Sequence, residues 1–170
     1  KRVTPRLMKA IDRAIDLCSQ TLNYATEDTI RLRPRRFPVR DLIDEVAATL
    51  TPEGDAPAPG WDIDVPDDID IVADRRHLLR ALHNLCGNAV EAGAVRISIG
   101  LARGDGVHCF EVTDDGPGLP QKARDNLFKP FTGSGRKGGT GLGLVIVRDI
   151  VRAHGGEVHL ISTGDGGTRF

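Results

Sequence analysis

Two asparagines on one predicted helix are the first residues of the chain whose spacing suits chemistry. Asn84 and Asn88 lie four residues apart in the segment HNLCGNAVEAG, so their amides fall on one side of a helix. Side-chain amide oxygens are neutral, hard ligands that suit Mg²⁺ when the ion is shared with substrate phosphates. Taken alone, a solvated helix face is the commoner explanation of such a pair, so the pair needs support from other segments.

The segment TDDGPGLP (Thr113–Pro120) follows an apolar predicted strand and contains the second candidate group. A carboxylate at a strand end, followed by glycines, can place one acceptor in an apolar pocket while the backbone passes close by. Asp114 could accept a hydrogen bond from the exocyclic amine of adenine. Asp-Gly and Pro-Gly are also strong turn formers, so a simple turn explains this segment equally well.

The segment GSGRKGGTGLGL (Gly133–Leu144) has six glycines among its first eleven residues and leads into a predicted helix. Glycines remove the side chains that would keep the backbone from a triphosphate, and a helix N-terminus offers N–H groups to anionic oxygens. Thr140 could cap that helix, and Arg136 and Lys137 add cations. A solvated glycine-rich loop explains neither the clustering at a helix start nor the apolar run that follows. The segment therefore favours phosphate binding.

One string match in this region is misleading. Gly133, Gly135 and Gly138 reproduce the dinucleotide fingerprint as letters, but that motif must follow a buried strand and open a helix at once. Here it follows LFKPFT, and the helix begins later. The Walker-type phosphate loop is absent from the sequence.

The spacing of apolar residues predicts the elements that position these segments. Val95, Ile97, Ile99 and Leu101 alternate and point one way, and GDG (Gly104–Gly106) supplies a hairpin turn to the next strand. The predicted helices are Asp41–Leu50, Asp74–Glu91 and Thr140–His154, and the predicted strands are Trp61–Val65, Asp68–Ala73, Val95–Leu101, Val107–Thr113, the turn and strand Gly155–Ser162, and a last strand within Gly164–Phe170.

The first thirty residues form a separate predicted unit. Within Pro5–Ile30, apolar residues recur at alternating spacings of three and four, which is the seam of a helix that packs on other helices: Met8, Ile11, Ile15, Cys18, Leu22 and Ala25. Nothing later in the chain matches this seam, so we expect a partner outside the sequence or a second copy of the chain. A helix lying on its own domain is the alternative. The run RLRPRRFP (Arg31–Pro38) predicts a linker that enters a short strand.

Composition excludes several classes of protein. The chain has 170 residues, a formal charge of −1 and only 4% aromatic residues, which argues against a nucleic-acid binder that uses a basic surface or base stacking. No apolar stretch approaches the ~20 residues needed to cross a bilayer, and no signal-peptide core is present. Cys18, Cys86 and Cys109 lie far apart in apolar patterns, which predicts reduced thiols in the core of a cytoplasmic protein.

The order of the motifs resembles the ATP-binding catalytic domain of sensor histidine kinases. An asparagine-rich helix is followed by Asp-x-Gly-x-Gly, by LFKPF (Leu127–Phe131) and by Gly-Thr-Gly-Leu-Gly-Leu at a helix start. The resemblance covers about Arg35–Phe170 and implies an α/β two-layer sandwich, with a mixed β-sheet and helices on one face. It divides the chain into residues 1–33, the second helix of a dimerisation and phosphoacceptor hairpin, and residues 34–170, the catalytic domain with its last strand truncated.

The resemblance also implies the roles of individual residues. Asn84 and Asn88 would hold Mg²⁺ and the phosphates, and Asp114 would bind adenine. Arg136 or Lys137 would lie near the γ-phosphoryl group, so these two and the two asparagines are the predicted catalytic residues. The other residues that would contact ATP, line its site or anchor the lid over it are Gly116, Gly118, Phe128, Phe131, Gly139, Thr140, Gly141, Leu142, Gly143 and, more loosely matched, Thr168.

Two departures from the family pattern shape the expected function. The basic residue that often follows the asparagine motif is replaced by Glu91–Gly93, and none of the five histidines has the family's phosphoacceptor context. We therefore expect the catalytic part of a kinase that phosphorylates a histidine outside this chain, in a homodimer that serves a response-regulator receiver domain. The alternatives are a non-catalytic dimeric phosphotransfer adapter and an ATP hydrolase. Hydrolase relatives have a glutamate where this chain has Asn84, which argues against hydrolysis.

Overall fold

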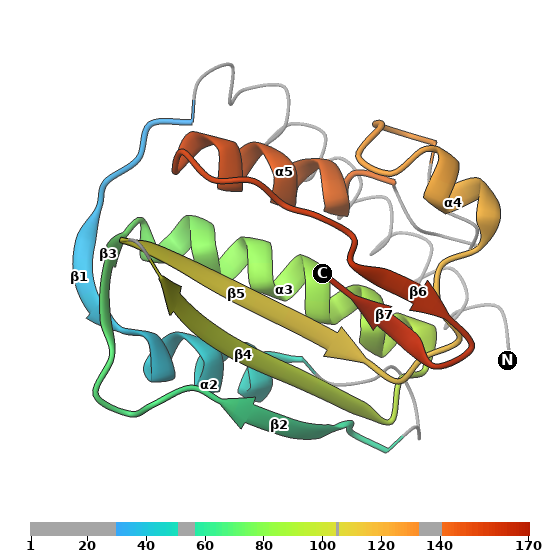
Figure 1. Ribbon diagram of the computed structural model, residues 1–170, viewed down its shortest axis with the longest axis horizontal. Helices are drawn as coiled ribbons and strands as arrows, with labels where there is room; N and C mark the ends of the chain where they lie inside the picture. The colour runs from blue at the N-terminus through green and yellow to red at the C-terminus, as the bar shows by residue number, and fades with distance from the viewer. Residues whose placement is uncertain (1–29, 51–56, 105, 133–140) are drawn as a thin grey trace, which may run out of the picture.

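The computed structural model describes residues 30–50, 57–104, 106–132 and 141–170. Two sheets and four helices are formed within these ranges (Figure 1). Their elements, in chain order, are β1 (Arg35–Pro38), α2 (Val39–Thr49), β2 (Gly60–Asp64), β3 (Asp70–Ala73), α3 (Arg75–Ala92), β4 (Arg96–Gly104), β5 (Val107–Asp114), α4 (Gln121–Asp125), α5 (Gly143–Ala153), β6 (Ser162–Gly164) and β7 (Gly167–Arg169).

The larger sheet has the strand order β2-β4-β5-β7-β6 and is mixed, because β2 runs parallel to β4 while the other pairs are antiparallel. The predicted hairpin is confirmed: Gly104 pairs with Val107 across the turn that joins β4 to β5. β7 enters the sheet between β5 and β6 and places Thr168 opposite Asp114. β1 and β3 form a separate antiparallel pair. The mixed sheet of the predicted α/β sandwich is therefore present.

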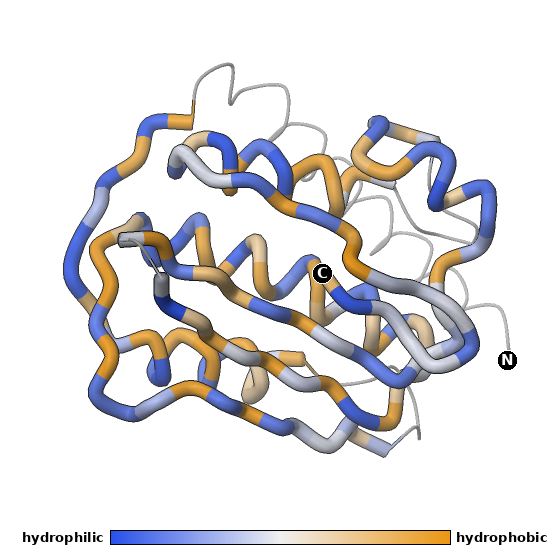
Figure 2. The backbone as a smooth tube through the Cα atoms, in the orientation of Figure 1, coloured by the Kyte–Doolittle hydropathy of each residue, from blue (hydrophilic) through white to orange (hydrophobic). Residues whose placement is uncertain are grey.

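Helices α2 and α3 pack against the larger sheet, and α3 lies between α2 and α5 (Figure 1). Apolar residues alternate with polar ones along the strands and helices, and the apolar ones form the core (Figure 2). The main cluster joins α2 and α3 to the sheet, and a second cluster joins α3 to α5. The fully buried side chains are Val39, Leu42, Ile43, Val46, Cys86, Ile97, Ile99, Leu142, Val145, Val147 and Ile150.

Helix α3 has well-defined ends. The Asp74 side chain accepts a hydrogen bond from the His77 backbone N–H at 3.1 Å, which caps the helix start. Gly93 ends the helix with a φ of 82°, a left-handed conformation that glycine adopts without strain. The predicted helix at Asp74–Glu91 is confirmed, and its two asparagines lie on the face toward the start of α5.

Asp74 also joins three segments of the chain. Its second carboxylate oxygen accepts the Arg33 N–H at 2.8 Å, and its own N–H donates to His154 Nε2 at 3.1 Å at the end of α5. The His77 ring lies beside the carboxylate, with Nδ1 3.0 Å from Oδ1. Burial alone would raise the pKa of Asp74, but these hydrogen bonds from Arg33 and His77 outweigh it and lower the pKa to about 2.

Several predicted details are wrong. Val95 is 72% exposed because it precedes β4 and does not share the buried face of Ile97. Cys109 is exposed, since it lies on the face of β5 opposite the core, whereas Cys86 is buried as predicted. The strand expected within Gly155–Ser162 begins only at Ser162.

Helix α5 also departs from its prediction, because it begins at Gly143 and not at Thr140. Its N-cap residue is Leu142, which supplies no side-chain cap. The predicted seam helix and the segment 133–140 lie outside the described residues.

Candidate nucleotide site

The two asparagines of α3 converge on the first residue of α5. The Asn84 Nδ2 group donates to the Arg80 carbonyl at 2.9 Å, which turns its carbonyl oxygen toward α5. A Cβ atom at Gly143 would lie 3.3 Å from Asn84 Oδ1 and 3.8 Å from Asn88 Oδ1. The two amide oxygens therefore meet at one point, where α5 begins.

Glycine at position 143 keeps that point open. A side chain there would fill the space that the two amide oxygens border. The first turn of α5 adds backbone N–H groups and the positive end of a helix dipole. Two hard, neutral oxygens beside a helix N-terminus suit a phosphate group that arrives with a divalent cation. The residues present thus fit the predicted Mg²⁺ and phosphate site.

Asp114 lies at the end of β5, close to the same helix. Its Oδ1 atom accepts the Gly116 N–H at 2.8 Å. Burial, together with the nearby negative charge of Asp114, raises the pKa of the Cys86 thiol to about 12. Cys86 lies on α3 between Asn84 and Asn88, so the carboxylate is near the helix that carries both amides. The structure thereby brings the asparagine helix and the segment of Asp114 close together. Gly143, near the end of the glycine-rich segment, lies beside them.

Three glycines allow the chain to pass closely around Asp114. A Cβ at Gly116 would lie 2.9 Å from Asp114 Oδ1, and one at Gly167 would lie 1.7 Å from the Asp114 carbonyl oxygen. At Gly118 it would lie 2.4 Å from the Gly164 carbonyl oxygen. Gly118 and Gly167 also have φ values of 73° and 108°. The role expected for Gly116 and Gly118, to let the chain pass the nucleotide, stays a prediction, and Gly167 belongs to a segment that matches the family only loosely.

Thr168 is buried on the strand next to Asp114. Its hydroxyl lies 3.3 Å from the Thr163 hydroxyl, which accepts the Leu119 N–H at 2.7 Å. These contacts tie the loop after Asp114 to β6 and β7. Thr168 was predicted to lie near the nucleotide and Thr163 was not, because β6 and β7 are too short to be recognised reliably from sequence.

The two phenylalanines predicted to anchor a lid differ in their surroundings. Phe128 is half-buried, but Phe131 is 63% exposed and does not show the packing that anchoring requires. Both have a φ of 62°. Arg148 of α5 donates to the Phe128 carbonyl at 2.8 Å and is itself paired with Asp149. Arg148 therefore ties this turn to α5, and its helical position gave no indication of that contact.

The remaining predicted residues have mixed outcomes. Gly141 has a φ of 69°, a conformation that favours glycine. The Leu142 side chain is fully buried in the cluster between α3 and α5, so only its backbone could face a phosphate. Arg136, Lys137, Gly139 and Thr140 lie outside the described residues.

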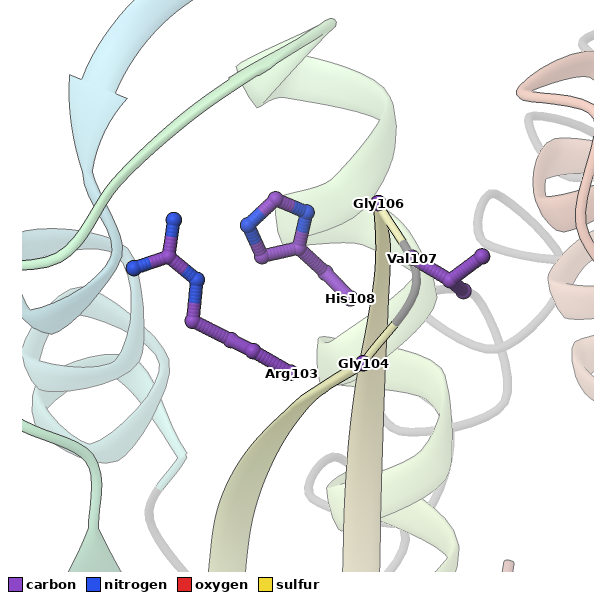
Figure 3. Close-up of a pocket in the computed structure, with 5 residues that line it drawn as sticks. All are labelled: Arg103, Gly104, Gly106, Val107 and His108. Atoms are coloured by element: carbon purple, nitrogen blue, oxygen red, sulfur yellow. The ribbon is translucent and has the colours of Figure 1, made fainter.

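A hollow of about 260 Å³ lies at the β4–β5 hairpin (Figure 3). Its lining residues are Arg103, Gly104, Gly106, Val107 and His108. Val107 begins β5 and Asp114 ends it, so the hollow lies at the opposite end of that strand from the candidate site. Among the described residues that were predicted to bind the nucleotide, none lines this hollow. Among the described helices, none has the length and apolar character to cross a bilayer.

The chain is similar to a known family of ATPases and to several of its members. The family described as "Histidine kinase-, DNA gyrase B-, and HSP90-like ATPase" matches residues 73–170. The chain is 29% identical over 168 residues to the alginate biosynthesis sensor protein KinB of Pseudomonas aeruginosa, covering 94% of this chain and 28% of the relative. It is 38% identical over 147 residues to sensor histidine kinase AruS of the same species, covering 79% of this chain and 15% of the relative. The chain thus spans less than a third of the length of either relative.

Solved structures show the same architecture. The structure titled as full-length ShkA in complex with AMPPNP has a TM-score of 0.78 and 29% identity, with 98% of this chain and 36% of that chain covered. The histidine kinase AdeS of Acinetobacter baumannii shares the fold, with a TM-score of 0.79 at 23% identity and coverage of 100% and 82%. With its mixed sheet and converging motifs, the chain belongs to the histidine kinase-, DNA gyrase B- and HSP90-like ATPase family, in the branch formed by the ATP-binding catalytic domains of sensor histidine kinases.

Proposed function

We propose that this chain binds Mg-ATP and transfers its γ-phosphoryl group to a histidine imidazole outside the chain. The observation that carries the proposal is the convergence of the Asn84 and Asn88 amide oxygens on Gly143, with Asp114 close to the same helix. Asp114 would accept from the adenine amine, and the two asparagines would hold Mg²⁺ and the phosphates. The ion, when bound, supplies neutralisation of triphosphate charge.

The chain's contribution to such a transfer is positioning and charge complementarity. The P–O bond between the β–γ bridging oxygen and the γ-phosphorus breaks, and ADP leaves. A bond forms between that phosphorus and a ring nitrogen of a neutral imidazole, which then loses its N–H proton. The backbone N–H groups at the start of α5 would face the phosphates, with Arg136 or Lys137 near the γ-phosphoryl group.

Transfer to a histidine is favoured over hydrolysis by the side chain at position 84. Activation of water requires a group that takes up a proton, and an amide does not do so at neutral pH. The Asn84 Nδ2 group is already bonded to the Arg80 carbonyl. The asparagine, aspartate and glycine residues of the family motifs are all present in this chain, which favours nucleotide binding over a non-catalytic adapter.

The proposed partners rest on the resemblance of the sequence motifs to sensor histidine kinases. KinB and AruS are named as sensor proteins, and this chain corresponds to only a part of each. We propose a phosphoacceptor helix in the same full-length protein or in its dimer partner, a response-regulator receiver domain as the next acceptor, and a cytoplasmic location for this part.

Replacement of Asn88 tests the site. Asn88→Asp places a carboxylate against the phosphates, so we expect loss of Mg-ATP binding by at least about tenfold, the equivalent of one charge repulsion of ~1.4 kcal/mol. The measurement is an equilibrium titration of the chain with a fluorescent ATP analogue, with and without Mg²⁺. Asp67→Asn, at an exposed position next to Arg40, serves as the control and should bind normally. Unchanged affinity of the Asn88→Asp variant would refute the assignment.

A further inference from the structure

The two adjacent aspartates Asp114 and Asp115 have different surroundings, and the sequence alone does not distinguish their roles. Asp114 is half-buried and bonded to Gly116, whereas Asp115 is exposed. Successive residues of an extended chain point to opposite sides, so only one of the two can face the candidate site. The structure leaves Asp115 outside the nucleotide site and gives it another set of partners.

Asp115 binds the start of the neighbouring strand. Its Oδ1 atom accepts the Val95 N–H at 2.7 Å and the Arg96 N–H at 2.8 Å. Its own N–H donates to the Arg96 carbonyl at 3.3 Å. These three bonds join the residue directly after β5 to Val95, which precedes β4, and to Arg96, which begins it. The hydrogen bond from Arg96, followed by that from Val95, lowers the pKa of Asp115, so the carboxylate is ionised at neutral pH.

The bonds of Asp115 constrain the backbone of Asp114 on one side. On the other side, Gly167 lies so close to the Asp114 carbonyl that no side chain would fit between them. Between these restraints, the last residue of β5 has little freedom to rotate or shift. A shift of about 1 Å is enough to misplace a hydrogen-bond acceptor in a binding site.

We propose that Asp115 is a positioning residue that holds Asp114 in the orientation required to bind the adenine amine. The inference rests on the proposed function, because it assumes that Asp114 is the adenine acceptor. Asp115 itself would touch no part of the nucleotide. Its carboxylate acts through hydrogen-bond geometry, by fixing the junction between β4 and β5 at the residue next to Asp114.

The geometry supplies a matched set of variants. Both backbone donors share one oxygen, so the single carbonyl oxygen of asparagine can accept both bonds in Asp115→Asn. Asp115→Ala has no acceptor. Asp115→Glu keeps the charge but adds a methylene group, which displaces the oxygen from the two N–H groups. Asp115→Asn thus keeps the hydrogen-bond geometry without the charge, and Asp115→Glu keeps the charge without the geometry.

The experiment is a titration of each variant of the 170-residue chain with a fluorescent ATP analogue, followed by competition with ATP and with GTP. We expect Asp115→Ala and Asp115→Glu to bind about tenfold more weakly, the equivalent of one to two lost hydrogen bonds, and to discriminate less between the two nucleotides. Asp115→Asn should stay within about threefold of the unaltered chain. Near-ultraviolet circular dichroism at the assay temperature identifies the folded variants, and Asp115→Glu replaces Asp115→Ala if the latter is unfolded.

Asp114→Asn, measured in parallel, separates the inference from the proposed function. If Asp114→Asn loses ATP preference while Asp115→Ala and Asp115→Glu keep it, the positioning role is wrong and the adenine site stands. If Asp115→Asn is as weak as Asp115→Ala, charge and not hydrogen-bond geometry is responsible, and the inference is also overturned. Unchanged selectivity in Asp114→Asn would refute the adenine assignment itself, and the inference would fall with it.

Discussion

At the scale of single residues, the candidate site depends on a missing side chain as much as on those present. The amide oxygens of Asn84 and Asn88 come from one helix, and the space they border is kept open by Gly143 on another. A Cβ atom at this position would approach Asn84 Oδ1 to 3.3 Å, a distance at which the amide must move. Glycine at this helix start therefore has a steric explanation.

Gly143→Ala should separate folding from binding. Alanine at a helical position stabilises a fold by up to about 1 kcal/mol relative to glycine, so the thermal midpoint should stay constant or rise. Crowding of the asparagine amides should weaken Mg-ATP-analogue binding about fivefold, the equivalent of ~1 kcal/mol of overpacking. Thermal unfolding and equilibrium titration measure the two effects.

Gly87→Ala is the matched control for that prediction. Gly87 is also helical, and a Cβ there would meet Leu50 Cδ2 at 3.7 Å, an ordinary contact. The control should gain helix stability and retain affinity. Equal affinities for the two alanine variants would show that the space beside Asn84 is not used by the nucleotide.

At the scale of elements, α3 and α5 join the candidate site to the segment that precedes β1. The amides lie near the start of α5, and Asp74 binds α3, the end of α5 and the Arg33 backbone at the other end of the two helices. Ile30 packs against the cluster between these helices. Residues 30–33 are thereby attached to the helices that carry the site.

Asp74→Asn should weaken the attachment of Arg33 to the two helices and change the acid stability of the fold. The folded-state pKa of Asp74 is about 2, below the ordinary value of 3.8, so its contribution is complete above pH ~4 and is lost as the pH falls toward 2. This shift is equivalent to about 2 kcal/mol at neutral pH. We expect the variant to be less stable at pH 7 and to lack this component of acid unfolding in urea titrations.

The hydrogen bond from the Arg33 N–H to Asp74 can also be tested locally, by amide hydrogen exchange. Asparagine has one side-chain oxygen, so it can cap the His77 N–H or accept the Arg33 N–H, but cannot do both as Asp74 does. Amide hydrogen exchange at Arg33 should therefore accelerate in Asp74→Asn. Asp67→Asn, which alters only an exposed ion pair with Arg40, should change neither stability nor exchange. Unaltered exchange at Arg33 in Asp74→Asn would contradict the claim that Asp74 attaches this segment to α3 and α5.

At the scale of the whole molecule, burial and hydrogen bonding distinguish the five histidines as possible acceptors of a phosphoryl group. His77 is buried beside Asp74, and His154 accepts a backbone hydrogen bond through Nε2. His83 and His159 are exposed, and His108 lies at the far end of β5 from Asp114. Burial and hydrogen bonding disfavour His77 and His154 as acceptors, whereas the exposed His83 and His159 are disfavoured only because their sequence lacks the family's phosphoacceptor context.

We therefore expect no phosphorylation of this chain when it is incubated alone with γ-³²P-labelled ATP and Mg²⁺. Addition of a dimeric phosphoacceptor hairpin from a histidine kinase should yield acid-labile label on the hairpin. A hairpin with its acceptor histidine replaced by alanine should remain unlabelled. Label on this chain alone, above that of a denatured sample, would contradict the proposed transfer to an external histidine.

Much of the fold could be predicted because its main elements have strong local patterns. The spacing of apolar residues predicted α3, and the alternation at Ile97 and Ile99 predicted β4. The short strands at the sheet edge and the start of α5 have no long apolar repeat, so local pattern does not fix their bounds. Val95 and Cys109 were misjudged because periodicity does not reveal where a strand begins or which of its faces is covered.

The sequence by itself determined the family, the three motifs and the chemistry that their residue types allow, because residue type and spacing are local properties. Only the tertiary structure decided that Asn84, Asn88 and Gly143 share one point, that Asp114 and not Asp115 faces the asparagine helix, and that Arg148 reaches the Phe128 carbonyl. Those contacts join residues from different elements, and their distances follow from how helices and strands pack, which no local pattern encodes.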